Sequence, residues 1–169
     1  MRAENGRKRS VSYTIPSRLD IVISPDEKTA TIKFAENIET QTKTVEVENG
    51  LTETTTLYVY DHYELNVSNR PGLYDNVVAS PQKWLEMAKK KEYESLAGAI
   101  RQKRNELLGE SDKEFCIDRI LPDSISTTAF TAKLRELAQG EMAKYRQALR
   151  DIPQQAEFPY NVTFPDKPQ

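Results

Sequence analysis

Apolar residues follow two different periods along this 169-residue chain, and the change between them constrains the fold more than any other feature. Over residues 13–68, apolar and polar side chains alternate in short runs, as in strands with one covered face. After Ser80-Pro81, apolar residues recur at mainly helical spacings. Serine caps a first helical turn, and proline needs no N–H there. The sequence therefore predicts an α+β fold, with a β-rich module over 13–79 and a helical module over 80–169.

Four antiparallel strands are expected, arranged as two hairpins. The first hairpin turns at Ser24-Pro25-Asp26-Glu27, where proline presets φ and aspartate can bond its own backbone. The second turns at Asn49-Gly50, because both residues tolerate a positive φ. The last strand is long enough to need a bend or bulge, expected near Asp61. Residues 1–12 are polar and basic, and are expected to form a disordered arm. The expected strands cover residues 19–23, 29–34, 44–47 and 54–67.

Two helices and an extended tail are expected in the helical module. The first helix begins at Pro81 and ends at Gly109, since glycine suits the position after a helix. After an irregular link, a second helix begins near Ser126 and ends at about Asp151. Residues 153–169 contain four prolines, which favour an extended chain. Apolar side chains alternate along this tail at Phe158, Tyr160, Val162 and Phe164.

Charge and composition argue against several classes of partner. The formal net charge of −2 provides no basic field for nucleic acid. No apolar run approaches the roughly 18–20 residues that span a bilayer, and residues 1–10 lack the apolar core of a secretory signal. The single cysteine, Cys116, cannot form an internal disulfide, which fits folding in a reducing cytoplasm. We therefore expect neither nucleic acid nor a membrane as partner.

No group of residues in the sequence predicts catalysis. The single histidine, His62, lies in a strand pattern, where a surface or cross-strand role is expected. A nucleophilic pair of His62 with Cys116 is conceivable, but Phe115 and Ile117 flank the cysteine and favour a buried, inert thiol. One histidine and one cysteine cannot form a structural zinc site, and no glycine-rich phosphate loop is present. We expect no catalytic residue, cofactor or metal, and infer that the protein acts through its surfaces.

The C-terminal residues carry a specific signature. A helix ending Tyr-Arg-Gln-Ala-Leu-Arg-Asp-Ile-Pro over 145–153 is followed by Phe158-Pro159 and by Val-Thr-Phe-Pro over 162–165. Upstream, residues 101–108, Arg-Gln-Lys-Arg-Asn-Glu-Leu-Leu, fit the pattern R-x-x-R-[DN]-x-L-L. Together these elements resemble phage tail assembly chaperone proteins, which are small proteins and C-terminal modules from tail-fibre operons of tailed phages and prophages. The resemblance does not reach residues 1–80.

The resemblance implies a non-enzymatic bacteriophage tail or tail-fibre assembly protein that binds a phage tail or tail-fibre protein. It would act in the host bacterial cytoplasm during assembly. The alternative is a structural component of the tail fibre or baseplate that stays in the virion tail; a homo-oligomer is left open. For Phe158 and Phe164, the alternative is that the tail covers the chain's own helix pair. The expected partner-binding residues are Tyr145, Arg146, Leu149, Arg150, Phe158, Tyr160 and Phe164.

Overall fold

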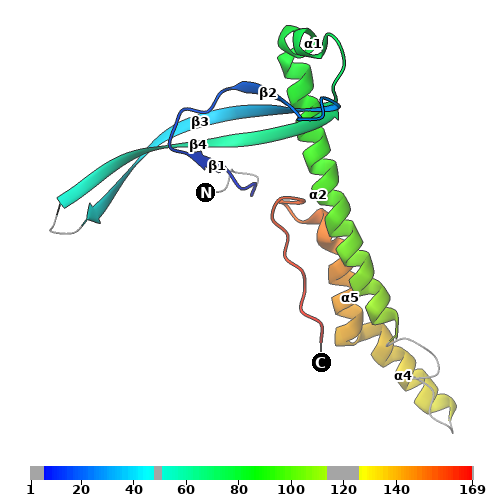
Figure 1. The fold of residues 1–169 in the computed structure, drawn as a ribbon. Helices are drawn as coiled ribbons and strands as arrows, with labels where there is room; N and C mark the ends of the chain where they lie inside the picture. Colours follow the sequence, from blue (N-terminus) through cyan, green and yellow to red (C-terminus); the bar gives the residue numbers. More distant parts are fainter. Residues whose placement is uncertain (1–5, 48–50, 114–125, 169) are drawn as a thin grey trace. The chain divides into compact units, whose positions relative to one another are not determined.

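The computed structural model describes residues 6–47, 51–113 and 126–168. The chain forms two units, Met1–Ser95 and Leu96–Gln169, and each is described by itself. Helix α2 (Pro81–Asp112) begins in the first unit and ends in the second, so the division between the units falls within the residues of α2. The sequence analysis placed the module boundary at the start of this helix. The predicted α+β fold, with an antiparallel β-module before a helical pair and a tail, is confirmed (Figure 1).

The first unit contains an antiparallel sheet with the strand order β1-β4-β3-β2. The predicted first hairpin is present, with Leu19 opposite Phe34 and Ile23 opposite Ala30. Its second strand does not stop at residue 34, because β3 continues through to the second hairpin. The residues of β3 between the two predicted strands, 35–43, are mostly solvent-exposed. Their sequence therefore shows no alternation of apolar and polar side chains. The predicted turn at Asn49-Gly50 lies outside the described residues. The strands are β1 (Ser10–Ser12), β2 (Leu19–Ile23), β3 (Thr29–Val47) and β4 (Leu51–Ser68).

A β-bulge interrupts the pairing of β3 with β4. Glu36 pairs with Asp61, but Glu39 pairs with Val59, so β3 carries one extra residue. Asn37 within the bulge has a positive φ of 50°, and its side-chain amide donates to Asp61 Oδ2 at 2.7 Å. The irregularity expected near Asp61 is therefore confirmed, although the extra residue lies on the opposite strand.

One face of the sheet packs against two helices to form the core of the first unit. The chain turns at Gly72, whose φ is 76°, into the short helix α1 (Leu73–Ala79), which the sequence analysis missed. Only Leu73 and Val77 of α1 are buried, too few to reveal a helical period. Helix α2 begins at Pro81, as predicted. The buried core residues are Ala30, Ile32, Phe34, Leu65, Leu73, Val77, Trp84, Leu85 and Ala88.

The described part of the N-terminal arm is ordered, which corrects the prediction of a disordered arm for residues 6–12. Residues 10–12 form β1, paired with residues 58–60 of β4. Arg7 is buried, and its guanidinium lies 2.9 Å from Glu92 Oε1 and 4.0 Å from the Tyr63 ring centroid. Arg9 Nε lies 3.3 Å from Asp61 Oδ1. Arg7 and Arg9 of the arm thus pair with carboxylates, of which Asp61 is buried and Glu92 is partly exposed.

The second unit contains the end of α2, helices α4 (Thr127–Gln139) and α5 (Glu141–Asp151), and a short 3-10 turn, η3 (Ile152–Gln154). Helix α2 continues past Gly109 to Asp112, so the predicted end at Gly109 is wrong. Ser126 caps α4 as predicted, because its Oγ accepts the Ala129 N–H at 3.2 Å.

Gly140 divides the predicted second helix into α4 and α5. Its backbone is extended, with φ −70° and ψ 175°. A Cβ at this position would lie 2.5 Å from the carbonyl oxygen of Glu136, so the close approach requires glycine. The tail is also less extended than predicted, because residues 155–161 form turns before residues 162–168 run without regular structure. The expectation for Cys116 falls outside the described residues. No helix in the described ranges is long and apolar enough to cross a membrane.

Candidate functional site

Helix α5 contributes a fully buried stripe to the core of the second unit. Tyr145 is 5% exposed and Leu149 is 0% exposed, and with Ile152 they form the centre of the cluster. Two residues expected to contact a partner therefore lie inside the module and hold its parts together. Burial raises the pKa of the Tyr145 phenol, and Glu110 raises it further, so the phenol is neutral at physiological pH. Partly buried side chains around them are Ile100, Leu107, Leu108, Met142, Phe158, Val162 and Phe164.

The tail lies against the module's own helices. The Arg101 guanidinium is 5.7 Å from the centroid of the Phe158 ring, and Lys103 Nζ is 4.4 Å from that of Phe164. Arg101, the first arginine of the upstream signature, and Lys103 thus place cations of α2 over aromatic rings of the tail. Phe158 and Phe164 thus lie where the alternative interpretation expected them, against the chain's own helices. Their role in binding a partner stays a prediction.

Gln155 fixes the course of the tail. Its side-chain amide donates to the Thr163 carbonyl at 2.8 Å, and its Oε1 accepts the Thr163 N–H at 2.8 Å. The side chain therefore pairs with the backbone as a neighbouring strand would. The segment between them contains a cis peptide bond at Phe158-Pro159 and a turn from Glu157 to the half-buried Tyr160.

Arg146 closes the C-terminal end of α2. Its Nη1 donates to the Leu108 carbonyl at 3.2 Å and to Ser111 Oγ, and lies 2.6 Å from Asp112 Oδ1. The negative end of a helix dipole favours a cation, so this guanidinium is well placed at the end of α2 and joins α5 to it. The signature arginine thus has a structural role. Ser111-Asp112 are its partners, which spacing along the sequence alone could not identify.

A groove of about 570 Å³ lies along α5 beside its junction with α4. Arg150, an expected partner-binding residue, is exposed and lines it together with Arg146. The sequence analysis did not single out Lys144 or Gln147, although Gln147 is three residues from each of Lys144 and Arg150, a spacing that brings side chains together on a helix surface. The lining residues are Ala138, Gln139, Ala143, Lys144, Arg146, Gln147 and Arg150.

The single histidine lies on β4 beside a carboxylate and an aromatic ring. His62 Nε2 lies 3.1 Å from Glu64 Oε1, and its ring stacks on Tyr60 with centroids 6.1 Å apart. Its position on β4 agrees with the strand position inferred from the sequence. Within residues 6–47, 51–113 and 126–168, no group of three or more His, Cys, Asp or Glu side chains could hold a metal ion.

Comparison with known proteins identifies the C-terminal part of the chain. Residues 97–169 match the model of a family described as phage tail assembly chaperone protein. The match begins one residue after the start of the second unit, so the family module and the structural unit coincide. The family resemblance inferred from the signature is confirmed. No curated protein and no solved structure matches the chain.

Proposed function

Because residues 97–169 match the phage tail assembly chaperone family, we propose that the chain assists tail assembly by binding a tail-fibre protein through its second unit. The protein acts without catalysis, in the host bacterial cytoplasm. The observation that carries this proposal is the coincidence of the family match with a unit that has its own core around Tyr145, Leu149 and Ile152. A module with its own core can present a fixed surface to a partner.

Helix α4 offers an apolar surface for such binding. Phe130 and Leu134 are four residues apart, on one helix face, and are 37% and 48% exposed. Apolar side chains exposed at helical spacing are typical of helices that pack against another protein. The buried signature residues hold the module's core together, while α4 and the outer face of α5 supply contacts.

A second candidate function, a structural component of the tail fibre or baseplate, is favoured by the ribbon formed by residues 40–47 and 51–57. These parts of β3 and β4 pair with each other, while β1 and β2 pair only with residues 58–60 and 30–34 (Figure 1). Such a two-stranded ribbon is only marginally stable by itself, and its open edges can pair with another strand. Pairing with a β-rich virion protein would stabilise it. Its exposed threonines are Thr40, Thr42, Thr44, Thr52, Thr54 and Thr56.

Quantitative mass spectrometry of purified virions separates the two functions. We expect the protein in lysates of infected cells but not in virions, because an assembly factor leaves its product. Peptides of the major tail protein in the same digest serve as the control for recovery. Stoichiometric presence of this chain in virions would contradict the assembly role and support the structural one.

A further inference from the structure

The groove beside the α4–α5 junction has an uneven charge. Among the described residues, its lining includes the cations Lys144, Arg146 and Arg150 and no carboxylate. Lys144 Nζ lies 2.6 Å from Glu141 Oε1, but both side chains are mostly exposed, so this pair is weak and readily exchanged. Arg146 is held by the end of α2. No carboxylate of the described residues forms an ion pair with the exposed Arg150.

We infer that this groove binds an acidic segment of a partner protein. The inference rests on the proposed function, and it specifies the chemistry of the segment that docks. A guanidinium forms two parallel hydrogen bonds with a carboxylate, and Arg150 presents that group at the surface. Gln147 donates one amide N–H to Asp151 and can donate the other to a carbonyl or carboxylate of the peptide, and Ala138 and Ala143 provide an apolar lining for aliphatic side chains.

Charges around the groove favour a peptide over a nucleic acid. Glu136 and Glu141 on α4 and α5, and Asp151 after Arg150, lie within a few residues of the lining. Glu136 pairs with Lys133, and Asp151 accepts a hydrogen bond from Gln147, so these carboxylates already have partners. These carboxylates would repel the evenly spaced phosphates of a nucleic acid. A short peptide, in contrast, can place its carboxylates opposite the cations alone.

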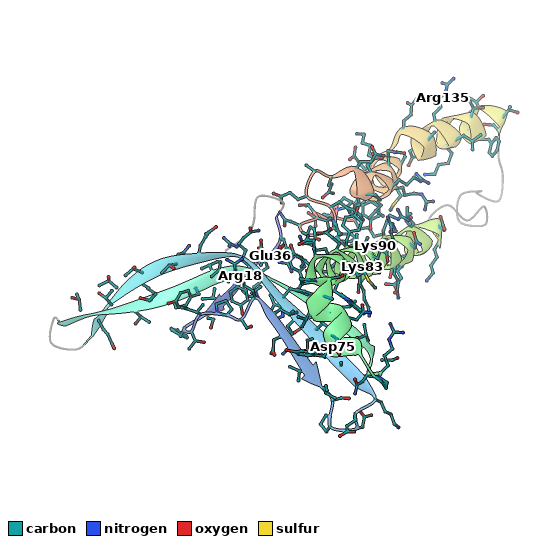
Figure 2. The ribbon with its side chains drawn as sticks, turned by 90° about the horizontal axis from the view of Figure 1, so that it is seen from above. Arg18, Glu36, Asp75, Lys83, Lys90 and Arg135 are labelled. Carbon is teal, nitrogen blue, oxygen red and sulfur yellow. The ribbon has the colours of Figure 1, made fainter. Side chains whose placement is uncertain are left out.

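The test measures binding of the full chain to a fluorescent octapeptide of alternating glutamate and alanine, by fluorescence anisotropy at low salt. Arg150→Glu is expected to weaken binding by about tenfold or more, because a contact becomes a repulsion. Arg135→Glu is the matched control. It makes the same charge change at an exposed residue of α4 outside the groove lining, and is expected to change the Kd less than about twofold (Figure 2).

Any of the following results would overturn the inference. These are equal losses in the two variants, an unchanged Kd in Arg150→Glu, or tighter binding of an eight-residue oligothymidylate than of the peptide. A peptide with lysine in place of glutamate should bind Arg150→Glu better than the unaltered chain, and failure to do so would also count against the groove. Thermal melting of each variant verifies folding. Capture of the tail-fibre protein by the unaltered chain is measured separately, so the groove can fail while the proposed function stands.

Discussion

Leu149→Ala is expected to lower the free energy of unfolding of the second unit by about 2–5 kcal/mol. Leu149 is fully buried between α2 and the tail, so its truncation leaves a cavity in a small core. Domains are stable by only about 5–15 kcal/mol, so a loss of this size leaves much of the unit unfolded on mild denaturation.

Urea denaturation followed by two signals checks this result. The single tryptophan, Trp84, lies in the core of the first unit, so its fluorescence reports that unit, while circular dichroism at 222 nm reports all helices. In Leu149→Ala, part of the ellipticity should be lost at a lower urea concentration than that at which the fluorescence changes. Leu134→Ala is the control, since Leu134 is 48% exposed, and it should cost less than about 0.5 kcal/mol. Equal effects of the two substitutions would show that Leu149 is not a core residue.

Arg7→Met is expected to destabilise the first unit by about 3 kcal/mol, because it removes one partner from a buried charge cluster. The side chains of Arg7 and Asp61 are only 6% and 8% exposed. Arg7 donates to Glu92 Oε1 at 3.0 Å and to the His62 carbonyl, and its guanidinium stacks on Tyr63. Removing it leaves Glu92 without this partner and Asp61 with less positive charge nearby.

The Trp84 fluorescence transition measures this effect, which should appear as a lower urea midpoint. Lys8→Met is the matched control, because Lys8 is the exposed neighbour of Arg7 and should change the midpoint little. If Arg7→Met and Lys8→Met unfold at the same urea concentration, the arm is not anchored as described.

Local signals predicted those elements of the fold whose residues carry clear patterns. Ser80-Pro81 and Ser126 mark helix starts correctly, and the hairpin at residues 24–27 follows from its turn residues. The break at Gly140 escaped prediction because its cause is a close approach to the Glu136 carbonyl, which is a property of the folded backbone. The ordered conformation of residues 6–12 was not predicted either, since it depends on ion pairs with carboxylates that are distant in sequence.

The candidate site shows the same division. The signature identified the family and drew attention to Tyr145, Leu149 and the two arginines, but sequence spacing does not distinguish a core stripe from a binding stripe. Tyr145 and Leu149 face inward because α2 and the tail cover them. The groove could not be predicted, because it depends on the angle between α4 and α5 that brings Ala138 near Arg150.

The central claim is that the second unit binds a phage tail protein. Isothermal titration calorimetry of the full chain with the purified tail-fibre protein of the same phage tests it most directly. We predict a saturable complex of fixed stoichiometry, which Lys8→Met retains and which Leu149→Ala loses at a urea concentration that unfolds the second unit of this variant but not that of the unaltered chain. Absence of any complex with the folded, unaltered chain, or unchanged affinity of Leu149→Ala at that urea concentration, would contradict it.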